Sequence, residues 1–146
     1  MPIITLKNIS GCGPLIDVFF SPPDALADVL RGAGRPVPLP VVVPALLDTG
    51  SARTLIDTAI AEQLGIEPSG STRLRTPTTG DGYEVRQTFD VGFGWGAPQV
   101  TFVSGYHQVI ASDLGSLGIR ALIGRDLLAG CQLVYNGPQD EFTLSF

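Results

Sequence analysis

Cysteine, histidine and charged residues are scarce in this chain of 146 residues, and each shortage excludes a class of chemistry. The two cysteines, Cys12 and Cys131, are too few for a disulfide scaffold and lack the spacing of metal ligands, so we expect free thiols. His107 is the only histidine, so a histidine-based triad or a multi-histidine metal site would depend on it alone. We expect His107 at the surface or on an edge strand, and we expect no metal or other cofactor.

Long apolar runs and runs of like charge are absent as well. No segment approaches the roughly 20 apolar residues that cross a bilayer, and the N-terminal residues do not have the pattern of a signal peptide. The chain has 9 basic and 14 acidic residues without basic clusters, which argues against a nucleic-acid partner. These features predict a cytoplasmic protein that binds neither membrane nor nucleic acid.

Glycine and proline are plentiful, with 18 and 12 residues, and 44% of the chain is hydrophobic. This composition is typical of a compact, turn-rich β protein, and the length suffices for one core. We expect one domain over residues 1–146, mainly β, forming a closed β barrel with little helix. Apolar spacing predicts a short helix over residues 24–31, and capping signals predict another over residues 57–64.

Residues 41–56 place one carboxylate, Asp48, between two apolar runs. Residues 41–47 are β-branched and aliphatic, which predicts a strand buried on both faces, and residues 54–56 predict a second strand. The Asp-Thr-Gly-Ser sequence between them predicts a tight turn. An ordinary turn, in which Asp48 only accepts hydrogen bonds from the following amides, is one interpretation. However, a carboxylate beside a core is costly unless another group shares its charge, which favours a functional role.

Two motifs together carry a family resemblance. The sequence Leu-Leu-Asp-Thr-Gly-Ser at residues 46–51, followed by Ala-Leu-Ile-Gly-Arg-Asp-Leu-Leu at residues 121–128, resembles the retropepsin family, the single-domain aspartic proteases of retroviruses and their cellular relatives. The resemblance extends from about Leu15 to the end of the chain. It implies that Asp48 is the catalytic residue and that the later motif packs beneath its loop. The loop-support residues it implies are Thr49, Gly50 and Ser51, and the packing residues are Leu122, Ile123, Gly124, Arg125 and Asp126.

The chemistry of this family requires a pair of carboxylates that share one proton. The chain contains no second Asp-Thr-Gly or Asp-Ser-Gly, so the resemblance implies a homodimer whose two-fold axis brings two copies of Asp48 together. The expected activity is that of an aspartic endopeptidase, in which the Asp48 pair activates a water molecule to hydrolyse a peptide or protein substrate. A hydrogen bond from Ser51 to the carboxylate would lower its pKa and favour a moderately acidic optimum.

Residues 71–76 and 83–90 alternate in polarity around a glycine-containing turn, which predicts a long hairpin. The resemblance implies that this hairpin is a flap that closes over substrate. An ordinary exposed turn is the alternative, because glycines are common at hairpin tips. The residues that would form the tip of the flap are Thr78, Thr79, Gly80 and Asp81.

Several further elements are expected along the chain. Residues 92–98 predict a turn, with Trp95 serving either as core filler or as a substrate contact. Residues 1–7 and 141–146 predict terminal strands, which either interleave between two subunits or pair within one chain. The other predicted strands cover residues 15–20, 99–103, 106–110, 119–123 and 131–135, and a further short helix is predicted over residues 125–129.

One departure from the resembled pattern concerns Arg125. In retroviral proteases the equivalent arginine pairs with an aspartate two places after the motif glycine, where this chain has Ala52 followed by Arg53. We expect Arg125 to pair instead with Asp57, Asp126 or a carboxylate of the other chain, because such a charge is seldom buried alone.

Two other functions remain open from the sequence. The domain is either a protease or a dimerisation and peptide-binding module with weak or no proteolysis, because a fold does not determine an activity. A purely structural barrel within a larger assembly is the third interpretation.

Overall fold

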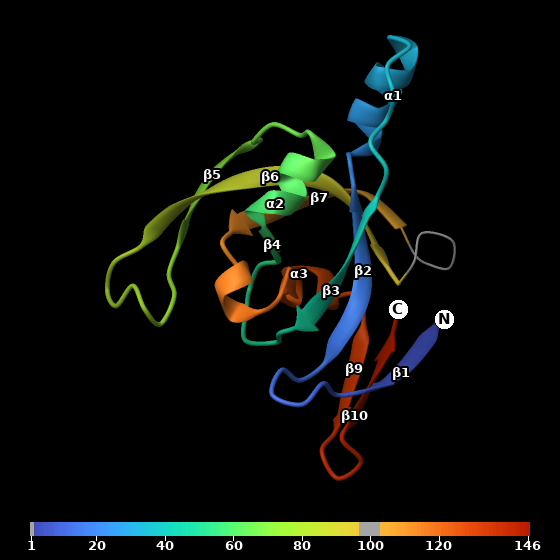
Figure 1. Ribbon diagram of the computed structural model, residues 1–146. Helices are drawn as coiled ribbons and strands as arrows, with labels where there is room; N and C mark the ends of the chain where they lie inside the picture. The colour runs from blue at the N-terminus through green and yellow to red at the C-terminus, as the bar shows by residue number, and fades with distance from the viewer. Residues whose placement is uncertain (1, 97–102) are drawn as a thin grey trace.

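The fold is organised around a closed β barrel (Figure 1). The computed structural model describes residues 2–96 and 103–146, and within these residues six strands form the ring. In their order around the barrel they are β2 (Leu15–Ser21), β3 (Val41–Leu47), β8 (Ala121–Ile123), β4 (Leu55–Asp57), β7 (Val103–Ser112) and β6 (Glu84–Trp95). Antiparallel pairing of β2 with β6 closes the ring, which confirms the predicted closed barrel.

The parallel pairing of β3 with β8 positions the residues that follow these two strands. Leu47 at the end of β3 lies beside Ile123 at the end of β8. Because parallel strands end at the same edge of a sheet, Asp48 and Gly124 leave the barrel next to each other. The two motifs, at residues 46–51 and 121–128, therefore meet in space although they lie far apart in the sequence.

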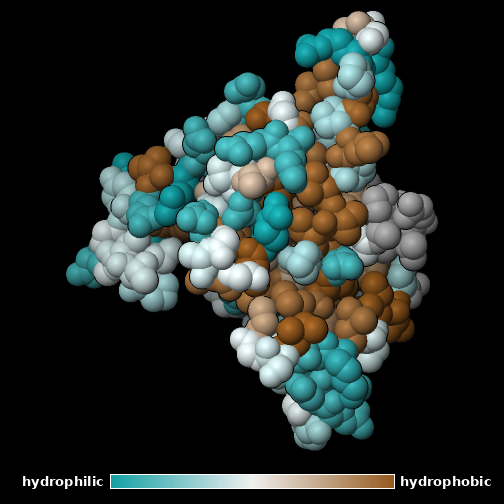
Figure 2. All heavy atoms as spheres, in the orientation of Figure 1, coloured by the Kyte–Doolittle hydropathy of each residue, from teal (hydrophilic) through white to brown (hydrophobic). Residues whose placement is uncertain are grey.

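Strand β3 is buried on only one face, so the prediction of a strand buried on both faces was wrong. Val43 and Ala45 face the core, whereas Val42 is 48% exposed and Pro44 is also exposed. Helix α1 (Asp24–Gly32), which was predicted, projects away from the barrel and leaves this outer face open (Figure 1). Figure 2 shows apolar atoms gathered over β2 and β3, between α1 and the lower end of the molecule.

The two ends of the chain pair with each other in a second sheet of order β1 (Ile3–Lys7), β10 (Glu141–Ser145) and β9 (Gln132–Asn136). Of the two arrangements expected for the termini, the structure has the intrachain one. The sheet is continuous with the barrel core, because Phe142 and Leu144 of β10 are fully buried in the same apolar cluster. Burial of these side chains ties the C-terminal strand to the barrel.

Residues 92–95 continue strand β6 and do not form the predicted turn. Gly94 lies opposite Phe19 of β2, and the ring of Phe19 covers the space that a side chain at Gly94 would need. Trp95 is core filler: it is 2% exposed, with its ring 5.0 Å from that of Phe93 and 5.6 Å from that of Phe146. The predicted strand over 99–103 lies outside the described residues except for Val103, which begins β7.

The remaining elements follow their local sequence signals. Helix α2 (Thr58–Leu64) begins after Asp57, whose carboxylate accepts a hydrogen bond from Ala59 N at 3.0 Å, and it ends at Gly65 in the left-handed region. The predicted hairpin is present, with β5 (Gly70–Leu74) paired to β6 outside the closed ring. A short 3₁₀ helix, η1 (Gly115–Leu117), and helix α3 (Arg125–Leu128) complete the described elements.

The two cysteines and the helices can be described directly. Cys12 and Cys131 are free thiols. In the described ranges, no helix has the length and apolarity needed to cross a membrane.

Candidate active site

The backbone holds Asp48 in place at the end of β3. The Asp48 amide donates to the carbonyl of Ile123 at 2.9 Å, and the Gly50 amide donates to Asp48 Oδ1 at 2.8 Å. A Cβ at Gly50 would come within 3.0 Å of the same carboxylate oxygen, so glycine allows this close approach. The half-buried carboxylate of Asp48 is therefore fixed while one edge remains accessible.

The segment after β8 packs directly against this loop. The Arg125 amide donates to the carbonyl of Ser51 at 2.8 Å, and the Gly124 amide donates to Thr54 Oγ1 at 3.1 Å. A Cβ at Gly124 would lie 2.5 Å from the backbone carbonyl of Arg53, which no side chain tolerates. Glycine at this position thus permits contact between the backbones of the two motifs.

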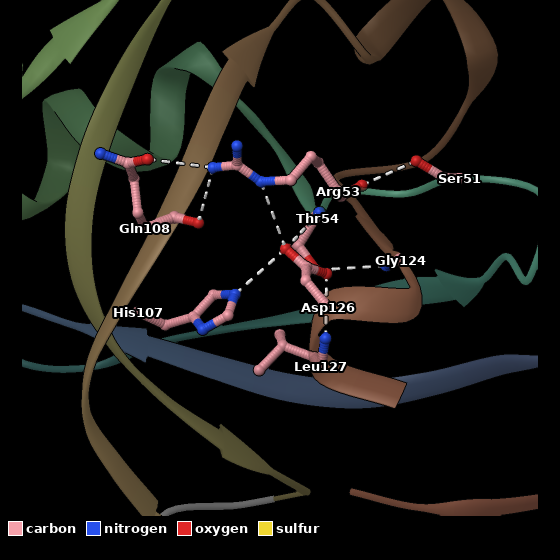
Figure 3. Close-up of polar contacts among 8 residues, drawn as sticks. All are labelled: Ser51, Arg53, Thr54, His107, Gln108, Gly124, Asp126 and Leu127. Atoms are coloured by element: carbon pink, nitrogen blue, oxygen red, sulfur yellow. Dashed lines mark hydrogen bonds and ion pairs between the residues drawn. The ribbon is translucent and has the colours of Figure 1, made fainter. Parts of the chain in front are cut away.

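Asp126 is the centre of the polar network under the loop (Figure 3). Its carboxylate accepts hydrogen bonds from Thr54 N at 2.9 Å, Thr54 Oγ1 at 2.7 Å and His107 Nε2 at 3.1 Å. Arg53 Nε lies 3.7 Å away and completes the charge pairing. Burial alone would raise the pKa of Asp126, but the hydrogen bonds from His107 and Thr54 outweigh it and lower the pKa to about 2.

The charge pair between loop and helix is reversed relative to the retroviral pattern. The cation, Arg53, lies on the loop, and the anion, Asp126, lies on α3. The guanidinium of Arg53 also donates to Gln108 Oε1 at 3.1 Å on β7. This arrangement gives the loop an anchor that does not use Arg125.

Within one chain, the partner of Arg125 is neither Asp57 nor Asp126, and its pairing with a carboxylate of the other chain stays a prediction. Its Nη1 donates to the carbonyl of Thr49 at 2.8 Å, so the expectation of a bond to Asp57 or Asp126 was wrong. Asp57 instead caps α2 and accepts from the amides of Leu114 and Gly115 at 3.1 and 3.0 Å. Because these two carboxylates are already engaged, Arg125 stabilises the loop that holds Asp48 through the carbonyl of Thr49.

Two further expectations require correction. Ser51 Oγ donates to the carbonyl of Arg53 at 2.7 Å and not to the Asp48 carboxylate, so the argument for an acidic optimum from Ser51 has no support. His107 is not on an edge strand, because β7 lies between β4 and β6, and its side chain is only 22% exposed. No sequence spacing links His107 to Asp126, and only the packing of β7 against α3 reveals the contact.

A cleft of about 640 Å³ opens beside Asp48. Asp48, Gly50 and Ser51 of the loop after β3 line it, and so do residues 74–78 of the predicted hairpin, including Thr78. Thr79, Gly80 and Asp81 are not among the lining residues; Thr79 Oγ1 closes the hairpin turn through the amide and carbonyl of Thr76, both at 2.9 Å. The other lining residues, which sequence reasoning missed apart from Leu122, are Leu55, Glu84, Arg86, Ser112, Asp113, Leu114, Leu117 and Leu122.

The cleft combines apolar side chains with the carboxylate of Asp48. Leucines from β4, β8 and η1 share it with Asp48, although no local pattern in the sequence joins them. Among the described residues, no group of three or more histidine, cysteine, aspartate or glutamate side chains is placed to hold a metal ion.

Comparisons with known proteins agree with this geometry. A family model described as aspartyl protease matches residues 33–92, which include Asp48. The crystal structure of a retropepsin-like aspartic protease from Rickettsia conorii is similar over 98% of this chain and 90% of that chain, with a TM-score of 0.59 and 15% identity. The fold of the chain is therefore retropepsin-like.

Two other retropepsin-like structures show weaker similarity. EIAV protease in complex with the inhibitor HBY-793 matches with a TM-score of 0.43 and 20% identity, over 64% of this chain and 83% of that one. The retroviral protease-like domain of Ddi1 from Leishmania major matches with a TM-score of 0.43 and 15% identity, over 85% and 82% of the two chains. None of the curated protein sequences compared with this retropepsin-like chain matches it significantly.

Proposed function

We propose that this retropepsin-like chain is an aspartic endopeptidase whose active form is a homodimer. The observation that supports it is the position of Asp48, whose carboxylate is fixed by the Gly50 amide and borders a cleft lined by leucines and by the hairpin. A group held in this way is positioned to act on a bound peptide. The proposed unit is the single domain over residues 1–146.

The chemistry requires two carboxylates in different protonation states. One Asp48, ionised, accepts a proton from water as the water oxygen attacks the carbonyl carbon of the peptide bond. The partner's Asp48, protonated, donates its proton to the carbonyl oxygen, which gives a gem-diol. As the C–N bond breaks, the leaving nitrogen takes the proton that the first Asp48 accepted from water, and a hydroxyl of the gem-diol returns a proton to the partner's Asp48. Two neighbouring carboxylates suit these roles because they cannot both ionise freely.

The other residues act in support. We propose that Thr49, which is exposed next to Asp48, contacts the corresponding loop of the second subunit, and that residues 122–126 hold the loop from below. We propose that substrate binds as an extended strand between the barrel and the hairpin, with residues 78–81 forming the tip of a flap. No cofactor is needed for this reaction.

A peptide-binding module is the second candidate. It is favoured by the presence of an entire cleft within one chain, because binding there needs no second subunit, whereas hydrolysis needs a second Asp48. One substitution distinguishes the two functions. Asp48→Asn removes the group that transfers the proton but keeps the shape of the side chain, so it should abolish cleavage and leave peptide binding.

The test is cleavage of an unstructured protein between about pH 4 and 7 over a range of protein concentrations. We expect activity that rises faster than linearly with concentration and that is abolished in Asp48→Asn. The matched control is Asp28→Asn, which removes the same charge from the exposed face of α1 and leaves activity unchanged. Peptide binding without cleavage by the wild type at every concentration would instead establish the binding module.

A further inference from the structure

Arg75 is an uncompensated cation in the wall of the cleft. It follows β5 directly, is exposed, and lines the same cleft as Asp48. Among the described residues, no carboxylate lies within ion-pair distance of its guanidinium. The charge of Arg75 is therefore available to a ligand.

The two other arginines of the hairpin, Arg73 and Arg86, already have partners within the chain. Arg86 also lines the cleft, but its guanidinium is paired with Glu84, another lining residue. Arg73 stacks over the ring of Tyr83, with its guanidinium carbon 4.5 Å from the ring centroid, and does not line the cleft. The hairpin side of the cleft thus carries one net positive charge, at Arg75.

Apolar surface surrounds this charge. Leu74 precedes Arg75 in the chain and lines the cleft together with four other leucines, at positions 55, 114, 117 and 122. An apolar side chain of a bound peptide can displace water from these leucines, while a neighbouring carboxylate meets the guanidinium. The lining also includes the exposed carboxylate of Asp113, which would repel an acid placed near it.

We propose that the cleft selects peptide segments in which an acidic side chain lies next to an apolar one, and that Arg75 binds the acid. This inference rests on the proposed function and names the substrate class for the same site. Arginine suits the role because its planar fork can hold both oxygens of a carboxylate. In the proposed dimer, the two copies of Arg75 extend the preference to both sides of the scissile bond.

The experiment uses peptides of about ten residues with two central leucines and with Glu, Gln or Lys at each flanking position in turn. The ratio of kcat/KM for the Glu and Lys peptides is measured for the wild type, Arg75→Gln and Arg75→Glu. Arg73→Gln is the matched control, because it removes the same charge from the same hairpin outside the cleft. Binding of the same labelled peptides to Asp48→Asn is followed in parallel by fluorescence anisotropy.

We expect the wild type to favour Glu over Lys by about two- to fivefold at one or more positions, as is typical of an exposed ion pair. The preference should disappear in Arg75→Gln, reverse in Arg75→Glu, persist in Arg73→Gln and weaken at high salt. A ratio near one in the wild type, or an unchanged ratio in Arg75→Gln, would overturn the inference. Absence of cleavage with every peptide would contradict the proposed function alone, and the anisotropy data would then decide the role of Arg75.

Discussion

Asp126 shows how much a single residue contributes to the site without touching substrate. Its carboxylate orders Thr54 after the Asp48 loop, His107 on β7 and the first turn of α3, through contacts that all favour the charged form. Since the side chain is only 16% exposed, solvent screens these contacts weakly. The ionised state of Asp126 is thus coupled to the folded state.

This coupling predicts a specific dependence of stability on pH. The pKa of Asp126 is about 2 in the folded chain, against an ordinary value of 3.8. The stabilisation is therefore present above about pH 4 and is lost as the pH falls towards 2, and it amounts to about 2 kcal/mol. Urea unfolding at a series of pH values should show that Asp126→Asn is less stable at neutral pH and has lost this part of the acid sensitivity.

The exposed Asp28→Asn change on α1 serves as the comparison, because its carboxylate pairs only with Arg31 at the surface. The free energy of unfolding of Asp28→Asn should depend on pH in the same way as that of the wild type. If the free energies of unfolding of the wild type and Asp126→Asn instead change with pH in parallel, the hydrogen bonds to Asp126 do not favour its ionised carboxylate.

Residues joined by short spacing could be predicted from the sequence, and residues joined only by folding could not. The position of Asp48 in a tight turn and the capping role of Asp57 follow from the local sequence. The contacts of Arg53 and His107 with Asp126 depend on β7 and α3 packing around the loop. The hydroxyl of Ser51 had several acceptors within reach, and the sequence alone did not distinguish among them.

At the scale of elements, the closure of the barrel depends on a glycine in strand β6. Gly94 pairs with Phe19 on β2, and a Cβ at Gly94 would lie 2.1 Å from Phe19 Cζ. Phe19 is only 4% exposed, so a side chain at Gly94 would press on a buried ring. The β2–β6 seam therefore requires the absence of a side chain at this position.

We expect Gly94→Ala to destabilise the chain by roughly 1–3 kcal/mol, because the added methyl group displaces a buried ring. The double variant Phe19→Ala/Gly94→Ala should lose less stability than the sum of the two single changes. Urea unfolding of the four proteins measures this coupling. Gly130→Ala is the control, since nothing lies within 4 Å of its added Cβ. If the effects of Phe19→Ala and Gly94→Ala on the free energy of unfolding add within about 0.5 kcal/mol, the predicted contact is contradicted.

The sequence predicted the elements that have clear local signals and missed those that depend on contacts between elements. Strands with clear alternation and helices with caps were predicted close to their observed bounds, as in β5 and α2. Residues 92–95 were predicted as part of a turn because glycines usually mark turns, whereas here Gly94 accommodates a ring from another strand. Strand β3 was predicted to be buried on both faces because its composition does not reveal that α1 projects away from it (Figure 1).

At the scale of the whole molecule, the proposed mechanism makes the active unit larger than one chain. Each subunit supplies one Asp48, so a mixed dimer of wild type and Asp48→Asn has only half of the catalytic pair. At concentrations where the chains are largely dimeric and exchange subunits, a tenfold excess of Asp48→Asn over wild type should reduce activity by about tenfold through mass action. Cleavage assays after co-incubation measure this loss.

An equal excess of Asp28→Asn provides the control, because this variant keeps Asp48 and adds active subunits. Activity should then rise. Full activity in the presence of excess Asp48→Asn, with subunit exchange verified by sedimentation of labelled chains, would show that one chain is sufficient for catalysis.

The pairing of the two chain ends has one more consequence, which concerns connectivity. Ile3 lies opposite Ser145, and the Phe146 amide donates to the carbonyl of Pro2 at 3.1 Å, so the ends lie side by side (Figure 1). A short linker can join them without crossing the barrel, and new ends can be opened in the exposed turn between β9 and β10. The linear order of the elements is thus one of several circular permutations compatible with the same barrel.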